Sequence, residues 1–168
     1  MGWILSRPMK LIPLLLCSLL GCCLLLAGCS TTASEVSGIT VSVDGFRKYD
    51  ASPVQTKAIM ILRFTSENTR AIGFSESTHR IYLNGSLVGT AVNNKPIGLP
   101  PLMSVTQDVV VDLVNPAVVK QAKAAAGDNP SRYRVESVLR FVLAEEKVQI
   151  KSVYDGTVDL RGLDTAAR

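Results

Sequence analysis

The sequence predicts an all-β fold, a β-sandwich of about seven strands with one α-helix at about residues 115–127. Three observations carry this prediction. Apolar and polar residues alternate with a period of two along most of the chain after residue 36. An Asn-Gly pair at 84–85 separates two apolar runs, which is a strong hairpin signal. One segment has the apolar spacing and the end signals of a helix.

The first two predicted strands begin near residues 39 and 57. The first has one buried face, formed by Ile39, Val41 and Val43. The second places four apolar side chains on one face: Ala58, Met60, Leu62 and Phe64. Ile59 and Ile61 interrupt its polar face. Two interpretations remain open for them: the helix covers this face, which we favour, or a cleft between the sheets accepts an acyl chain.

The next strands flank Asn84-Gly85 and a Pro-rich crossover at 95–101. The crossover leads into a strand from Ser104 to Val114, of which one apolar face is predicted to be buried, and Asp108 and Asp112 mark the other face as exposed to water. The helix follows at once. Its signals are a capping Asn115, Pro116 in the first turn, an apolar stripe (Val118, Val119, Ala122, Ala126) and a final Gly127.

The last two strands alternate most clearly. Tyr133, Val135, Leu139, Phe141 and Leu143 share one face of the first of them. A two-residue turn at Glu145-Glu146 would pair Phe141 with Ile150 and Arg140 with Lys151. The sandwich domain is therefore predicted over residues 36–162, with a C-terminal tail at 163–168.

The N-terminus has the order of a secretory signal peptide over residues 1–28. Arg7 and Lys10 precede an uncharged apolar run from Leu11 to Leu26. This run is shorter than the ~20 residues that a transmembrane helix needs, and Pro13 interrupts it. We therefore expect a cleaved signal rather than a transmembrane anchor.

The end of this leader resembles the lipobox of bacterial lipoproteins, with the residues Leu26, Ala27, Gly28 and Cys29. The resemblance implies that the chain is cut before Cys29, which then carries a thioether-linked diacylglycerol and an N-acyl chain. It also implies a lipid-anchored protein of the cell envelope, and Ser30 after the cysteine resembles an outer-membrane address facing the periplasm. Residues 29–35 form a short polar tether. The other cysteines, Cys17, Cys22 and Cys23, leave with the signal, so no thiol remains for a disulfide or a nucleophile.

Removal of the leader changes the charge balance. The full chain of 168 residues has 18 Lys plus Arg against 14 Asp plus Glu, and the leader contains two of the bases and none of the acids. The remainder is close to neutral, so we expect no nucleic-acid partner. A single His in the chain argues against a multi-His metal site, and we expect neither a metal nor a cofactor beyond the lipid on Cys29.

The strand pattern resembles the LEA type 2 family, also called the water-stress and hypersensitive-response (WHy) domain. The matching stretches are Ala58–Phe64, Arg80–Gly89, the Pro-rich link, the Val-rich strand, the helix and the strand that contains Tyr133. The family's Asn-Pro-Asn-like turn is replaced by 65–70, in which Asn68 alone matches. The resemblance implies an immunoglobulin- or fibronectin-III-like Greek-key β-sandwich without a catalytic centre. It also implies a protective role in desiccation, osmotic or cold stress.

Few residues are candidates for chemistry. His79 shares a strand face with Ile81 and Leu83, which favours a half-buried, hydrogen-bonded residue at the start of a strand over a catalytic one. Glu145 and Glu146 point apart at a hairpin tip, which favours a solvated turn over an acid pair. No motif of a nucleophile elbow or a phosphate loop is present. We therefore expect no catalytic residue.

Four basic residues are predicted on one outer face of the last two strands: Arg132, Arg134, Arg140 and Lys151. They are a candidate patch for anionic lipid head groups, although the interpretation we favour is a solvated strand face with counterions. The expected function is a non-enzymatic, membrane-anchored protein that protects client proteins or lipids through its surface. Two alternatives stay open: a periplasmic lipid-binding or lipid-transfer module, and an adaptor in an envelope complex.

Overall fold

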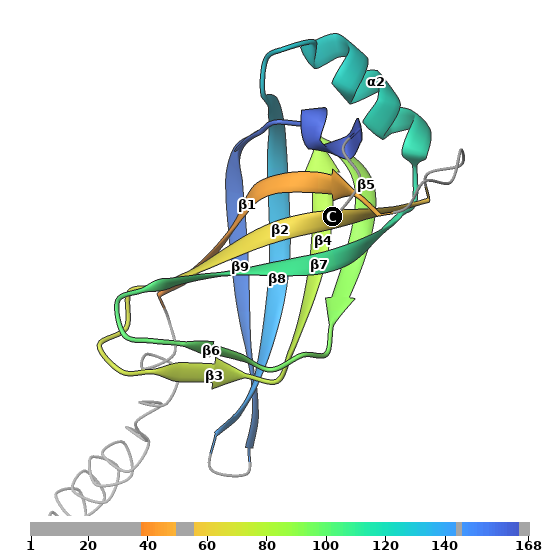
Figure 1. The fold of residues 1–168 in the computed structure, drawn as a ribbon. Helices are drawn as coiled ribbons and strands as arrows, with labels where there is room; N and C mark the ends of the chain where they lie inside the picture. Colours follow the sequence, from red (N-terminus) through yellow and green to blue (C-terminus); the bar gives the residue numbers. More distant parts are fainter. Residues whose placement is uncertain (1–37, 50–55, 144–145, 165–168) are drawn as a thin grey trace, which may run out of the picture. The chain divides into compact units, whose positions relative to one another are not determined.

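The computed structural model of the chain describes residues 38–49, 56–143 and 146–164. The predicted signal peptide, Cys29 and the tether lie outside these residues. Figure 1 shows the arrangement of the elements. The elements are β1 Ile39–Lys48, β2 Lys57–Ser66, β3 Ile72–Phe74, β4 Glu76–Leu83, β5 Ser86–Asn93, β6 Ile97–Leu99, β7 Ser104–Leu113, α2 Pro116–Ala126, β8 Ser131–Leu143, β9 Glu146–Val158 and the 3₁₀ helix η1 Arg161–Asp164.

Seven of the strands form one antiparallel sheet in the order β1-β2-β7-β5-β4-β8-β9, and β3 and β6 form a separate pair. The sheet bends at the junction of β5 and β7, where only Gly89, Thr90 and Ala91 pair with the facing strand. Figure 1 shows the result: β1, β2 and β7 cross over β4, β8 and β9 as a second layer. The predicted all-β sandwich with one helix is confirmed.

Gly89 permits the close approach at this bend. A Cβ atom on Gly89 would lie 2.5 Å from Cγ1 of Val111 and 3.0 Å from the carbonyl oxygen of Asp112. Such contacts are shorter than packed atoms tolerate, so the two strands could not meet there with a larger residue. The two parts of the sheet are hydrogen-bonded to each other through this short junction.

The core lies between the two layers. The inner face of β2 is completely buried, and its Phe64 packs against Phe74 with ring centroids 5.3 Å apart. Phe74 in turn meets Phe141 at 5.7 Å. The apolar space beneath α2, which Phe46, Val119 and Leu160 help to line, measures only about 10 Å³. That volume holds at most about one water molecule, so the core is filled at this end.

The structure contradicts both predictions for the isoleucines on the second face of β2, which were that the helix covers them or that they line a cleft for an acyl chain. Ile59 and Ile61 lie half-buried on the outer face of the sheet, and α2 packs near β4, β5 and β8 instead of covering them. Ile59 stands opposite Arg47 on β1 and Val110 on β7. Long neighbouring side chains therefore give these residues their partial cover, and neither a helix nor an acyl chain is needed.

The helix agrees with its predicted signals. The side-chain oxygen Oδ1 of Asn115 accepts a hydrogen bond of 3.3 Å from the backbone N–H of Val118, and Gly127 ends the helix with a φ of 56°. Val119 and Ala122 are its buried residues. No helix among the described residues is long and apolar enough to cross a membrane.

The strand pairings confirm one predicted hairpin and correct another. Leu83 pairs with Ser86 across Asn84 and Gly85, both of which have positive φ, as the Asn-Gly signal predicts. In the last hairpin, however, Phe141 pairs with Val148 and Arg140 with Gln149, so the predicted pairings with Ile150 and Lys151 are wrong. The shift is two residues. Such a shift leaves every side chain on its predicted face, which is why alternation alone could not detect it.

The C-terminal boundary also lies further on. η1 follows β9, and its Leu163 is only 5% exposed. The packed domain therefore continues through Asp164, two residues into the segment predicted as a tail.

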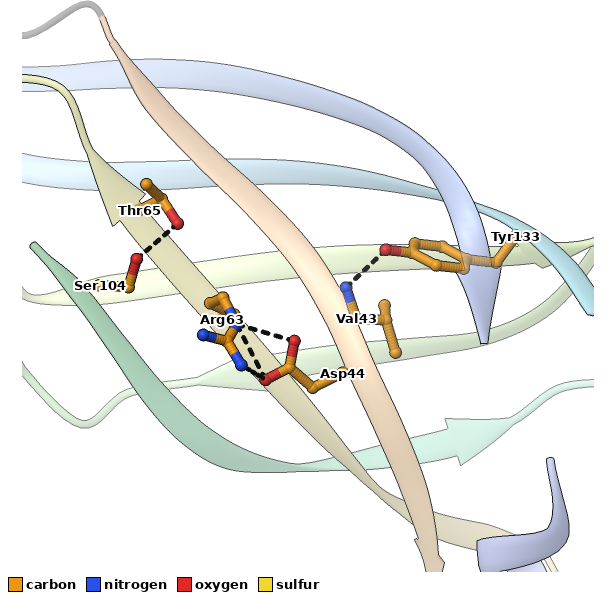
Figure 2. Close-up of polar contacts among 6 residues, drawn as sticks. All are labelled: Val43, Asp44, Arg63, Thr65, Ser104 and Tyr133. Atoms are coloured by element: carbon orange, nitrogen blue, oxygen red, sulfur yellow. Dashed lines mark hydrogen bonds and ion pairs between the residues drawn. The ribbon is translucent and has the colours of Figure 1, made fainter. Parts of the chain in front are cut away.

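The two outermost strands, β1 and β9, face each other through side chains. The backbone N–H of Val43 donates to the phenolic oxygen of Tyr133 at 2.8 Å, as Figure 2 shows, and the N–H of Val41 donates to Oγ of Ser152 at 3.3 Å. A Cβ on Gly156 would meet the Tyr133 ring at 2.9 Å, so only glycine lets the ring cross β9 toward β1. Burial raises the pKa of the Tyr133 phenol, which therefore stays neutral.

Candidate functional site

The two layers of the sandwich present outer faces of different charge. On the outer face of β1, β2 and β7, three basic and three acidic side chains form ion pairs one to one. Asp44 and Arg63 form a bidentate pair with distances of 2.6–3.0 Å, shown in Figure 2. The other two pairs are Arg47–Asp108 and Lys57–Asp112. We call this the balanced face.

The outer face of β4, β8 and β9 is basic. Alternation and the observed register bring together here the side chains of Arg80, Arg132, Arg134, Arg140, Lys147 and Lys151. The acidic side chains on the same face are Glu76, Glu136 and Asp155. Among the described residues of this face, the positive charges thus outnumber the negative ones by three. We call it the basic face, and it contains all four residues of the predicted patch.

Two of the four predicted patch residues are already engaged. Arg134 forms a bidentate pair with Asp155 at 2.9 and 3.2 Å, and this pairing raises the pKa of its guanidinium. Arg140 pairs with Glu76 and also contacts Oγ1 of Thr78 at 3.4 Å. Both guanidinium groups therefore already use some of their N–H donors in hydrogen bonds within the protein.

The remaining cations of the basic face are less constrained. Within the part of the chain that the structure describes, Arg132, Lys151 and Arg80 have no ion-pair partner. Arg80 was not singled out from the sequence, because it lies on β4 and joins this face only through pairing with β8. The sequence feature that could have placed Arg80 on this outer face is its exposed position between the buried residues 79 and 81.

These free cations lie along two hollows of the face. The first, of about 610 Å³, is lined by Tyr82, Arg132, Arg134 and Asp155 among others. The second, of about 380 Å³, is lined by Arg80, Val138, Lys151 and Val153 among others. Lys151 stands opposite Val138, six residues along β8 from Arg132, a separation of roughly 20 Å. The predicted patch is therefore two separate positions on one face rather than one convergent site.

The candidate imidazole is inaccessible. His79 lies in the middle of β4 with 0% of its surface exposed, deeper than the half-buried position at a strand start that the sequence predicts. Its Nδ1 is 2.8 Å from Oγ of Ser137, and its Nε2 is 2.9 Å from Oγ of Ser77. Burial lowers its pKa to about 4, so the ring is neutral at physiological pH. Both nitrogens are occupied, as the predicted structural role requires.

The other candidates considered from the sequence were an acid pair at the last hairpin and a metal site. Glu145 and the side chain of Glu146 fall outside the described residues. No cluster of three or more His, Cys, Asp or Glu side chains that could hold a metal ion occurs in residues 38–49, 56–143 and 146–164.

Comparisons with known proteins identify no family for this chain and find only distant structural similarity. No family model matches the chain, and no curated protein matches it. A solved structure of a protein from Archaeoglobus fulgidus has a TM-score of 0.42 at 14% identity, over 69% of this chain and 95% of that one. The solution structure of a protein from Arabidopsis thaliana has a TM-score of 0.47 at 16% identity, over 73% and 84%. At these TM-scores neither likeness adds to the argument.

Proposed function

We propose that this protein is a lipid-anchored protein of the bacterial cell envelope that works through its surface rather than by catalysis. The anchor is Cys29, which follows Leu26-Ala27-Gly28 at the end of a signal peptide. Its thioether-linked diacylglycerol and N-acyl chain give stable attachment, since two or more chains bind a bilayer far more firmly than one. The residue Ser30 supports placement in the outer membrane, facing the periplasm.

We further propose that the domain protects envelope proteins or lipids during desiccation, osmotic or cold stress, as the resemblance to the LEA type 2 family implies. The observation that carries the surface mode of action is the contrast between the two outer faces. One face pairs its charges internally, whereas the other keeps Arg80, Arg132 and Lys151 available for anionic groups of a partner.

The filled core and the buried His79 support the same proposal. Beneath α2 the apolar space is about 10 Å³, which gives no support to the alternative of a lipid-transfer module. An adaptor that docks an envelope partner on the basic face is compatible with the geometry, and crosslinking from Arg80 or Lys151 would identify such a partner.

The test measures the survival of bacteria under stress. A deletion strain complemented with the wild-type gene should survive drying, freezing and osmotic shock better than one complemented with Arg132→Gln/Lys151→Gln. The matched control is Lys57→Gln/Arg63→Gln, which removes the same charge from the balanced face. Equal survival of all strains, including the uncomplemented one, would overturn the protective role. Separately, Cys29→Ser should abolish fatty-acid labelling and leave an unprocessed precursor.

A further inference from the structure

Among the large apolar side chains of the described residues, the one with the highest exposed fraction lies in the loop between β6 and β7. Leu102 is 67% exposed and the adjacent Met103 is 57% exposed, directly after Pro100 and Pro101. A single exposed leucine is common on protein surfaces, but two long apolar residues side by side on a loop are less so. We call residues 100–103 the apolar tip.

The apolar tip is held in a defined conformation. Leu102 has a φ of 55°, in the left-handed region that side chains other than glycine rarely adopt. Its backbone N–H donates to the carbonyl oxygen of Asn68 at 3.0 Å, and the carbonyl oxygen of Met103 accepts from the N–H of Ser66 at 2.9 Å. The loop is thus fixed with its apolar side chains outward. An unfavourable backbone conformation held in this way is a feature often found at functional surfaces.

The apolar tip lies at the end of the sandwich where β1 begins. Ile39 pairs with Ser66, the same residue that bonds to Met103, and the N–H of Glu67 donates to the carbonyl oxygen of Gly38 at 2.9 Å. Figure 1 shows the start of β1, the end of β2 and the start of β7 together at this end. Only eight residues lie between Cys29 and Gly38, and the nine steps from one to the other span at most about 30 Å.

From this geometry we propose that the apolar tip docks into the surface of the bilayer that holds the lipid on Cys29. The inference rests on the proposed lipid anchor. Two side chains alone would hold a free protein weakly, but the anchor makes their insertion an intramolecular event at high effective concentration. No Asp or Glu occurs between Ser77 and Gln107, so the segment that contains the tip carries no charge that anionic lipids would repel. The adjoining loop adds one acid, Glu67, and one base, Arg70.

Tryptophan fluorescence tests this docking directly. The only tryptophan of the chain is Trp3, in the predicted leader, so the mature protein from Cys29 onward has none. Met103→Trp places a single reporter on the tip. The matched control is Val114→Trp, since Val114 is 58% exposed and lies just past the opposite end of β7, about 33 Å away. Each mature protein is reconstituted through its anchor into vesicles of phosphatidylethanolamine and phosphatidylglycerol, with or without brominated acyl chains.

The expected result is a blue-shifted emission for Met103→Trp and a loss of its intensity in brominated vesicles, with neither change for Val114→Trp. Adding Leu102→Gln to the Met103→Trp protein should reduce both effects. If the two reporters emit alike and neither is quenched, the docking proposal is wrong. The same holds if both are quenched equally, since the tip would then have no preference for the bilayer.

Two preparations keep this result separate from the anchor itself. In the first, the protein is purified from bacterial membranes, and mass spectrometry of its N-terminal peptide reports whether Cys29 is lipidated. In the second, Cys29, the only thiol of the mature chain, is coupled to a maleimide lipid in the vesicles. Residues Glu35–Arg168 form one compact unit, which suits this preparation. An unmodified Cys29 in bacteria would overturn the proposed anchor, while the second preparation still decides the docking of the tip.

Discussion

At the scale of single residues, polar groups inside the sandwich are matched with particular partners. His79 sits between two serine hydroxyls and beside Phe64, whose ring centroid is 6.0 Å away. A neutral imidazole has one donor and one acceptor nitrogen, and a hydroxyl can serve either, so both nitrogens are satisfied without charge. A proton added to this ring would be buried without a counter-ion.

This arrangement predicts a loss of stability in mild acid. The pKa of His79 is about 4 in the folded protein, below the ordinary histidine value of 6.5, so the unfolded chain takes up a proton first as the pH falls. The free energy of unfolding should fall by about 3 kcal/mol between roughly pH 6.5 and pH 4 because of this residue, and the full stability is present above that pH range. Urea unfolding across this range measures the loss. His79→Gln, which keeps a donor and an acceptor, should show a smaller pH dependence, and an equal one would refute the assignment.

At the scale of elements, β1 is fixed to β8 by one phenol. The Tyr133 oxygen accepts the N–H of Val43 in a buried position, and the glycine at 156 gives the ring its room. Sequence alternation placed Tyr133 on the inner face correctly. Alternation could not predict the hydrogen bond of Tyr133 to Val43, because the two residues are 90 positions apart and their strands, β8 and β1, are not neighbours in the sheet.

We expect Tyr133→Phe to destabilise the domain by about 1–3 kcal/mol, because it leaves the buried N–H of Val43 without a partner. Tyr154→Phe is the matched control: its ring lies 6.3 Å from that of Tyr133, and it is 39% exposed. Denaturant unfolding of the two variants measures the difference. Hydrogen exchange at Val43 should be faster only in Tyr133→Phe. Equal stability of both variants would show that water or a backbone shift replaces the bond.

The start of α2 offers a second test at this scale. Asn115→Ala should cost about 1 kcal/mol, since its side chain caps the N–H of Val118. Asn129→Ala, in the turn after the helix, removes the same amide from an exposed position and should change the free energy of unfolding little. An unchanged free energy of unfolding in Asn115→Ala would mean that the cap contributes nothing.

At the scale of the whole molecule, two layers divide the charge. Lys57 and Arg63 are held by carboxylates on the balanced face, whereas Arg132 and Lys151 project from the basic face. The sequence predicted the faces of individual strands well, because alternation decides them. It could not reveal the three ion pairs of the balanced face or the place of Arg80, because these depend on which strands become neighbours and in what register.

The difference between the faces predicts selective binding to anionic surfaces. Arg132→Gln/Lys151→Gln should weaken binding of the domain to phosphatidylglycerol vesicles by about 2 kcal/mol, as each cation near such a surface contributes about 1 kcal/mol. Lys57→Gln/Arg63→Gln changes net charge equally and should weaken binding less. Vesicle sedimentation at low and high salt measures both, and the difference should shrink at high salt. Identical losses would mean that only net charge matters.

The meeting of β1 and β9 has a consequence for a cell that is losing water. Drying concentrates proteins, and an open strand edge is then a template on which neighbouring chains pair and aggregate. Here the N–H groups of Val41 and Val43 are occupied by Ser152 and Tyr133 of the same chain. These donors are closed to intermolecular pairing, so the fold helps the protein remain unaggregated in the crowded state in which it is proposed to act.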